Sequence, residues 1–233
     1  MDPGRPWPGA EGPADSSGGS GTGGGSGTGG GSGTGGGSGT AVTAGLKADL
    51  RRRFLAARAA MTPDERNAAA RRIRDAVLGL PETGMAGTVA AYYSVGTEPD
   101  TRGLVYALWK RGSYVLLPRL RAGGELDWAS YEGPESLAPA RHGLLEPTAA
   151  GRGEDAITRA SLVIVPALAV DRSGGRLGRG LGCYDRALAR VAPAVPAIAL
   201  VYDAELVDTL PVEPHDRQVS MVARPGTGIT RLT

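Results

Sequence analysis

A strongly apolar segment, residues 161–170, leads directly into a glycine-rich stretch, residues 171–183, and then into a helix-like segment that starts at Tyr184. No other feature limits the possible folds of this chain as much. Both alternating faces of residues 161–166 are apolar, which is typical of a strand buried on both sides of a sheet. Glycines let the backbone approach an anion closely, and free N–H groups at a helix start point towards it. The pattern predicts a layered α/β domain with a phosphate cradle.

The glycine spacing excludes two well-known phosphate-binding motifs. Gly178, Gly180 and Gly182 read G-x-G-x-G, and no Gly-Lys-Ser/Thr occurs in the chain, so this is not a Walker A loop. It also differs from the dinucleotide fingerprint, because Cys183 and Tyr184 stand where the third glycine is expected. From the glycines alone, a flexible surface loop remains an alternative.

Periodicity along the rest of the chain predicts alternating helices and strands. A capping box with proline at the first helical position, Thr62 to Glu65, indicates a helix start. The expected helices cover residues 46–60, 63–80, 101–111 and 184–191. The expected strands cover residues 88–93, 113–117, 126–131, 161–166, 197–202 and 218–223. This order predicts an α/β fold, a single three-layer domain with a mainly parallel sheet.

The first part of the chain has a different composition. Residues 18–40 repeat Gly-Gly-Gly-Ser-Gly-Thr and offer no apolar side chains to bury. We expect residues 1–45 to be a disordered Gly/Ser/Thr-rich tail without the basic start and apolar core of a secretory signal. Residues 46–233 fit one domain by the usual size range.

Composition argues against several classes of function. The net charge of +2 argues against bulk nucleic-acid binding, and no apolar run is long enough for a membrane span. A single cysteine suits a reducing compartment, so we expect a cytoplasmic protein, with a monomer as the expected assembly. The chain has two histidines, no zinc-ligand spacing and no G-x-S-x-G elbow, so its motifs indicate no side-chain nucleophile.

Residues 165–186 resemble the signature of the 5-formyltetrahydrofolate cyclo-ligase (methenyltetrahydrofolate synthetase) family, roughly VPGLAFD-x-x-G-x-RLG-x-G-x-G-YYDR. The chain keeps the proline, the aspartate, the Arg-Leu-Gly, two further alternating glycines and the Tyr-Asp-Arg. It departs at Ala167, Val170 and Cys183, where the family usually has Gly, Phe, and Tyr or Phe. Weaker family landmarks occur in the same order between residues 46 and 223: Lys47-x-x-Leu50-Arg51, Tyr93-Ser94, Glu98-Pro99-Asp100-Thr101, Leu117-Pro118-Arg119 and Gly143-Leu144-Leu145-Glu146-Pro147.

The resemblance implies a specific reaction. 5-Formyltetrahydrofolate would become 5,10-methenyltetrahydrofolate while ATP becomes ADP and phosphate, with Mg²⁺ as the metal. The formyl oxygen would attack the γ-phosphorus, and N10 of the folate would then close the ring and displace phosphate. Because the substrate supplies both nucleophiles, the protein would act by positioning and by charge stabilisation.

The resemblance also assigns residues to ATP. Lys47 and Arg51 share one face of the first helix and would contact the phosphates, although an exposed basic pair is the alternative from spacing alone. Arg179, which would stabilise the transferring phosphoryl group, and Tyr184 are the catalytic candidates. The triphosphate would be wrapped by Arg176, Leu177, Gly178, Arg179, Gly180, Leu181, Gly182, Cys183 and Tyr184.

Other residues are assigned to the metal and the folate. Asp185 and Asp216 match the family's magnesium positions, and hard oxygen ligands suit that ion. Tyr93, Glu98 and His142 match the folate side, with Glu98 accepting hydrogen bonds from the pterin. Without the family, Glu98, His142 and Asp216 would be ordinary loop residues.

Two rival functions remain open. A non-catalytic folate- or nucleotide-binding module on the same fold is motivated by Cys183 and by Ser220, where the family usually has Asp. A kinase or ligase that uses the same loop on another small molecule is opposed only by the region around Tyr93 and Glu98.

Overall fold

The structure is a computed structural model that describes residues 37–84 and 87–232. Its main element is a seven-stranded sheet within those residues. The strands follow one another across it in the order β12 (Gly228–Arg231), β11 (Met221–Arg224), β9 (Ala197–Leu200), β6 (Leu162–Pro166), β1 (Thr88–Ala90), β2 (Tyr114–Leu120) and β3 (Leu126–Ser130). Neighbouring strands from β11 to β2 are parallel, and the two edge strands, β12 and β3, are antiparallel to their neighbours. The predicted α/β class with a mainly parallel sheet is confirmed.

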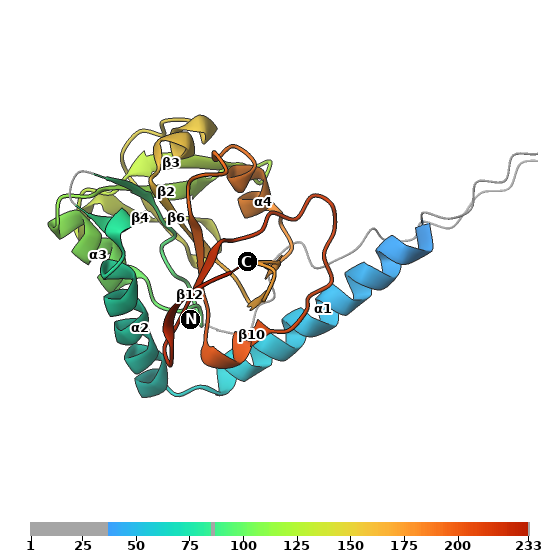
Figure 1. Cartoon of the computed structure of the whole chain (residues 1–233). Coiled ribbons are helices and arrows are strands. Elements are labelled where there is room, and N and C mark those ends of the chain that lie inside the picture. Colours follow the sequence, from blue (N-terminus) through green and yellow to red (C-terminus); the bar gives the residue numbers. More distant parts are fainter. Residues whose placement is uncertain (1–36, 85–86, 233) are drawn as a thin grey trace, which may run out of the picture.

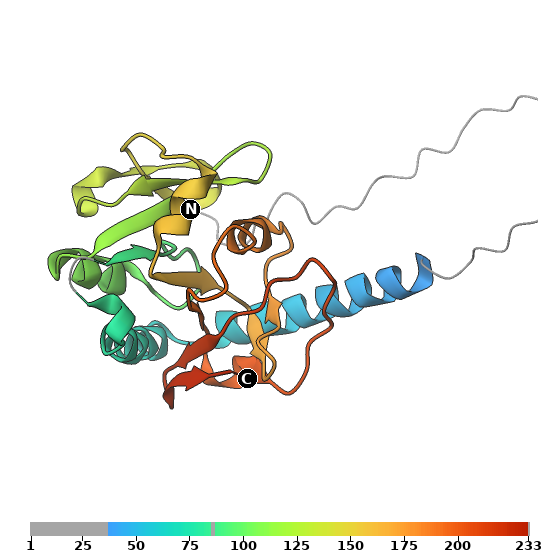
Figure 2. The same cartoon turned by 45° about the horizontal axis from the view of Figure 1, so that its top comes forward.

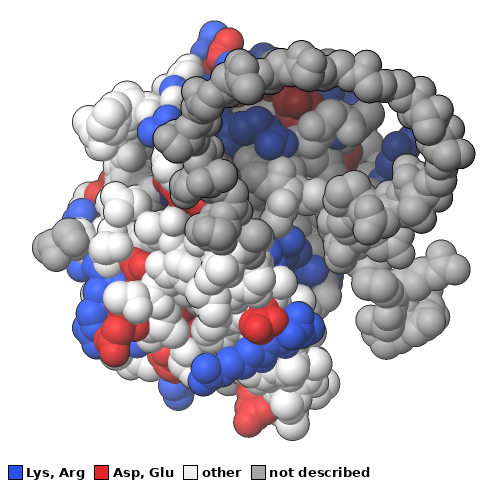
Figure 3. Space-filling model, turned by 90° about the vertical axis from the view of Figure 1, so that its right-hand side faces the viewer, with Lys and Arg blue, Asp and Glu red and all other residues white. Residues whose placement is uncertain are grey.

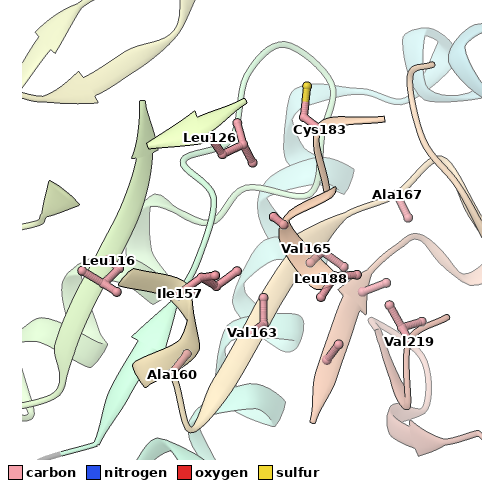
Figure 4. Packing of buried hydrophobic residues seen from close by; sticks show 14 of the residues in the cluster. Leu116, Leu126, Ile157, Ala160, Val163, Val165, Ala167, Cys183, Leu188 and Val219 are labelled. Atoms are coloured by element: carbon pink, nitrogen blue, oxygen red, sulfur yellow. The ribbon is translucent and has the colours of Figure 1, made fainter. Parts of the chain in front are cut away.

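Two helical layers cover the sheet because β6 is apolar on both faces. Leu162 and Ile164 pack with α2 (Pro63–Leu78) and α3 (Arg102–Lys110) on one side. Val163 and Val165 point to the other side (Figure 4), where they pack with η4 (Glu154–Arg159) and α4 (Cys183–Leu188). This alternation produces the three predicted layers.

The first helix, α1 (Gly37–Ala60), starts before the expected position at Leu46, so the described part of the predicted tail is helical. Its second half packs through Phe54 against Leu168, Leu177 and Leu210. Its first turns extend away from the body of the protein (Figures 1 and 2), and Leu46 is 52% exposed. Alanines at positions 41 and 44 favour the helix, whereas Val, Thr and Gly at positions 42, 43 and 45 are weaker helix formers. The predicted tail at residues 1–36 lies outside the described residues.

The capping box at Thr62 is confirmed: Glu65 N donates to the Thr62 hydroxyl at 3.2 Å, and Thr62 N donates to the Glu65 carboxylate at 2.7 Å. Helix α2 ends at Leu78, slightly earlier than expected. Short strands were not predicted, because two or three residues carry no readable period. Three of them form a small sheet in the order β10 (Leu206–Val207), β7 (Ala169–Asp171) and β8 (Arg176–Leu177). Two others, β4 (Leu137–Pro139) and β5 (Leu145–Pro147), form a hairpin. The remaining short 3₁₀ helices are η1, η2, η3 and η5 (Pro81–Thr83, Pro134–Ser136, Arg141–Gly143 and Asp203–Glu205).

Within the described part of the chain, no helix has both the length and the apolar character that crossing a membrane requires.

Candidate functional site

A cavity of about 260 Å³ opens beyond the carboxyl ends of β1, β2 and β6, as expected for a parallel sheet. The face shown in Figure 3 is hollowed, with Lys and Arg atoms gathered in the hollow and carboxylates among them. One part of the cavity wall is cationic, and another is apolar. The cationic part includes Lys47, Arg51, Arg58, Arg176 and Arg179, and the apolar part includes Pro118, Leu120, Leu126, Leu144 and Leu145.

The glycine-rich stretch forms the cavity wall from Gly178 to Asp185. Gly180 and Gly182 have φ angles of 106° and 64°, a region that side chains rarely adopt. A Cβ atom at Gly180 would also meet the Arg51 guanidinium at 3.5 Å. The glycines therefore let this loop fold tightly against α1.

Helix α1 brings two cations to the same wall. Lys47 Nζ donates to Glu213 Oε2 at 2.6 Å and to Asp216 Oδ2 at 2.7 Å, while Arg51 Nε donates to the Gly178 carbonyl at 2.9 Å. Burial by itself lowers the pKa of Lys47, but the bonds and charges of Asp216 and Glu213 outweigh it and raise that pKa. Burial raises the pKa of Asp216, and its bonds to Lys47 and to the Glu213 N–H reverse this to a net lowering. Lys47 is therefore a buried, charged group.

The predicted metal residues lie in one neighbourhood. Asp185 Oδ1 accepts hydrogen bonds from Arg176 Nη2 at 2.7 Å and from the Arg217 N–H at 3.1 Å, next to Asp216 in the chain. Ligand atoms of Asp216, His215 and Glu213 all lie within 4.8 Å of one another. Glu213 also lines the cavity and was not predicted from the sequence. Its only signal was its position three residues before Asp216 in the same loop.

Glu98 and Tyr93, which the resemblance assigns to the folate, both line the cavity. Glu98 Oε2 accepts a bond from the Val95 N–H at 3.0 Å, and Glu98 Oε1 lies 3.3 Å from Arg179 Nε. Burial is the main cause that raises the pKa of Tyr184, with a further contribution from the Glu98 charge. Tyr184 therefore keeps its phenolic proton at neutral pH and can donate a hydrogen bond into the site.

Three predicted site residues do not line this cavity. Leu177 is buried against Phe54, and Asp216 reaches the site through its bond to Lys47. His142 lies in η3 with a φ of 61°, although Leu144, two residues later, lines the cavity.

Cys183 lines the cavity but is 8% exposed, and burial raises the pKa of its thiol. The thiol is therefore neutral, which suits a small residue that fills space better than a nucleophile. Arg58 and Tyr92 also line the cavity and were not predicted, because no motif marks them. Glu146 lines it too; it lies in the Gly143–Pro147 landmark, which by itself indicated no role.

The fold and this cavity define a class of protein: a single α/β domain whose cavity joins a cationic, glycine-lined part to an apolar part, with the Glu98 carboxylate on the same wall. The model of the 5-formyltetrahydrofolate cyclo-ligase family matches residues 43–225. The match covers well over half of the chain, so this protein belongs to the 5-formyltetrahydrofolate cyclo-ligase family, a family of ligases. The family predicted from the sequence is thus confirmed.

Individual members of this family are similar to the chain over most of its length. A 5-formyltetrahydrofolate cyclo-ligase of Mycolicibacterium smegmatis is 41% identical over 191 residues, which are 80% of this chain and 97% of the relative. The enzyme of Escherichia coli K12 is 32% identical over 171 residues, 72% of this chain and 94% of the relative. The 5,10-methenyltetrahydrofolate synthetase of Aquifex aeolicus superposes with a TM-score of 0.68 at 25% identity, over 80% of this chain and 93% of that chain. The synthetase of Mycoplasma pneumoniae shares the fold, with a TM-score of 0.59 at 20% identity, over 76% of this chain and 96% of that chain.

Proposed function

We propose that this protein converts 5-formyltetrahydrofolate to 5,10-methenyltetrahydrofolate with ATP and Mg²⁺, releasing ADP and phosphate. One observation carries the proposal. Residues from α1, from the glycine-rich loop and from the Tyr93–Glu98 segment surround a single cavity. A cationic half suits a triphosphate, and an apolar half with a carboxylate suits a pterin ring.

The proposed reaction has two steps. The formyl oxygen attacks the γ-phosphorus, the bond from phosphorus to the β,γ-bridging oxygen breaks, and ADP leaves. N10 then attacks the formyl carbon and loses its proton, and phosphate leaves as the ring closes. Neither step requires a nucleophilic side chain, which fits a cavity whose thiol is neutral.

The side chains act by binding and by charge. Lys47, Arg51 and the loop from Arg176 to Tyr184 hold the phosphates, and Arg179 stabilises charge on the transferring group. Tyr184 donates a hydrogen bond, because its phenol stays protonated. Glu98, 10% exposed, accepts hydrogen bonds from the pterin, with Tyr93 beside it. His142 is proposed as a further folate contact at the edge of the site.

The residues present fit a magnesium ion. Asp216 and Glu213 place carboxylate oxygens within 4.8 Å of each other, and Asp185 lies beside the same loop. Such hard oxygen ligands, together with phosphate oxygens, are what Mg²⁺ prefers. We assign Asp185 and Asp216 as its protein ligands, with Glu213 adjacent. The ion would offset negative charge on the triphosphate.

We further propose that the protein is a monomer and that it works in the cytoplasm. A single cysteine, itself buried, suits a reducing compartment. Sedimentation velocity of the purified chain tests the assembly, and a dimer would contradict it.

The test of activity is absorbance at the methenyl-folate band, with purified protein, 5-formyltetrahydrofolate, Mg²⁺ and ATP, against a control without ATP. An ATP-dependent rise, with one ADP formed per product, is expected. A folded protein that gives no rise but binds both ligands would instead be the non-catalytic binding module. Turnover of ATP with a substrate other than a folate would identify a different kinase or ligase.

A further inference from the structure

Arg58 and Glu205 form a buried ion pair beside the cavity that none of the roles above uses. Arg58 is 1% exposed and Glu205 is 3% exposed. Nε and Nη2 of Arg58 donate to the two carboxylate oxygens of Glu205 at 2.7 and 2.8 Å. This forked arrangement with two bonds is the strongest geometry for such a pair. Arg58 is also part of the cavity wall.

Arg58 also attaches α1 to the site. Its Nη2 donates to the Ala167 carbonyl at 2.6 Å, directly after β6. Nearer the start of the same helix, Arg51 Nε donates to the Gly178 carbonyl at 2.9 Å, and Gly178 directly follows β8. The spacing of Lys47, Arg51 and Arg58 puts all three on one helix face. Two fixed points therefore set the position of the helix that carries the proposed phosphate contacts.

The same pair reaches the folate side. Glu205 Oε2 accepts a bond from the Tyr202 N–H at 2.7 Å, and the Arg58 guanidinium lies 5.4 Å from the centroid of the Tyr202 ring. The Tyr202 hydroxyl donates to the Thr97 carbonyl at 3.3 Å, and Thr97 precedes Glu98. A continuous series of contacts thus joins α1 to the segment that carries Glu98.

We propose that Arg58 is a positioning residue that, held by Glu205, sets the spacing between the phosphate-binding half and the folate-binding half of the cavity. The inference rests on the proposed function of those two halves. Stability alone is a weak reason for such a pair, because apolar residues of similar volume often replace buried ion pairs without loss. The bond from Arg58 to the Ala167 carbonyl and the bond from the Tyr202 N–H to Glu205 are contacts that apolar replacements cannot reproduce.

The decisive variant is the double substitution Arg58→Met with Glu205→Leu, which removes both charges together. Its melting temperature should fall only modestly, because loss of the charges offsets the unpaired Ala167 carbonyl and Tyr202 N–H. The KM values for ATP and 5-formyltetrahydrofolate should each rise about 10-fold, as expected for a misplaced helix. Arg58→Lys keeps the charge but loses the fork, and its KM values should lie between those of the wild type and the double variant.

Thr83→Val is the matched control. Thr83 is 3% exposed, and its hydroxyl donates to the Leu80 carbonyl at 2.7 Å, outside the cavity wall. This variant should lose stability and keep both KM values. Arg58 variants that are folded and have the KM and kcat of the wild type would overturn the proposal. Failure of both Arg58 variants to fold would overturn it too, since the pair would then serve the whole fold.

Binding separates this inference from the proposed function. If the wild type forms no methenyl product, the proposed function fails, and calorimetry with the Mg²⁺ complex of adenylyl imidodiphosphate takes the place of kinetics. A Kd about 10-fold weaker in the double variant, with Thr83→Val unchanged, would support the positioning role of Arg58. Equal Kd values in wild type and double variant would overturn it.

Discussion

Charged side chains around the cavity are bonded mainly to one another. Lys47 is held by two carboxylates, Arg176 by Asp185, and Arg179 by Glu98. Arg51 instead donates from Nε to a backbone carbonyl. A polyanion that enters the cavity must compete with these carboxylates. The affinity of each cationic side chain for phosphate is therefore reduced by the strength of the ion pair that has to break.

Lys47→Ala should raise the KM for ATP by roughly 10- to 150-fold, because a hydrogen bond to a charged group contributes about 1.5–3 kcal/mol. Steady-state kinetics at saturating 5-formyltetrahydrofolate measure this change. The chain offers one matched control, Lys110→Ala, because its only other lysine lies on α3 outside the cavity wall. An unchanged KM for ATP in Lys47→Ala would remove Lys47 from the site.

The pair of Lys47 and Asp216 gives stability a defined dependence on pH. The folded-state pKa of Asp216 lies below its ordinary value of 3.8, so its stabilisation is present above pH 3.8 and is lost as the pH falls through the lower folded value. Asp216→Asn should therefore melt below the wild type at pH 7, and the gap should close below pH 3.8.

Melting curves of both proteins across pH measure that gap. The control is Asp49→Asn, whose carboxylate is 66% exposed beside Arg52 on α1 and should contribute little at any pH. A gap between wild type and Asp216→Asn that stays constant through the acid range would mean that the ion pair does not stabilise the fold.

At the scale of the element, the two halves of helix α1 differ in how they pack against the rest of the protein. Its second half buries Phe54 at 5% exposure against the small sheet that holds the glycine-rich loop. Its first half carries Leu46, which is 52% exposed. The anchored half supports Arg51 and Arg58, while Lys47 is held by the loop of Glu213 and Asp216.

Phe54→Ala should lower the free energy of unfolding by about 3–5 kcal/mol, because it opens a cavity between α1 and the loop. Leu46→Ala, on the exposed half, should change it by less than about 0.5 kcal/mol. Urea denaturation measures both values. Equal effects of the two substitutions would show that the packing of α1 does not divide in this way.

At the scale of the whole molecule, the ion pair of Arg179 and Glu98 links the two halves of the site. Arg179 belongs to the glycine-rich loop after β8, and Glu98 to the segment between β1 and α3. In the proposed function, each residue serves a different ligand. A ligand that displaces one member of the pair frees the other, so the two binding events are coupled.

The Kd of adenylyl imidodiphosphate with Mg²⁺ should fall at least about 5-fold when 5-formyltetrahydrofolate is present, since such couplings typically amount to 1–3 kcal/mol. The reverse titration must give the same factor, because linkage is reciprocal. Glu98→Gln weakens the pair and should reduce the coupling. Independent Kd values in the wild type would exclude this link.

Much of the molecule could be predicted from local patterns. The apolar run before the glycines predicted the central strand β6, and the capping box predicted the start of α2. The start of α1 was missed because a polar, small-residue sequence that extends an anchored helix has no periodic signature of its own. Short strands such as β8 and β10 were missed because they exist only through their pairing partners.

The sequence by itself determined the family, the mainly parallel sheet and the glycine-rich loop that forms part of the cavity wall, because motif spacing and apolar periodicity are local properties of the chain. Only the tertiary structure determined which charged side chains pair with one another. The bonds of Lys47 to Glu213, Arg179 to Glu98, and Arg58 to Glu205 span 166, 81 and 147 positions of the chain. No local pattern encodes such pairs, since they arise only when the packed sheet and α1 bring distant charges into a common low-dielectric wall.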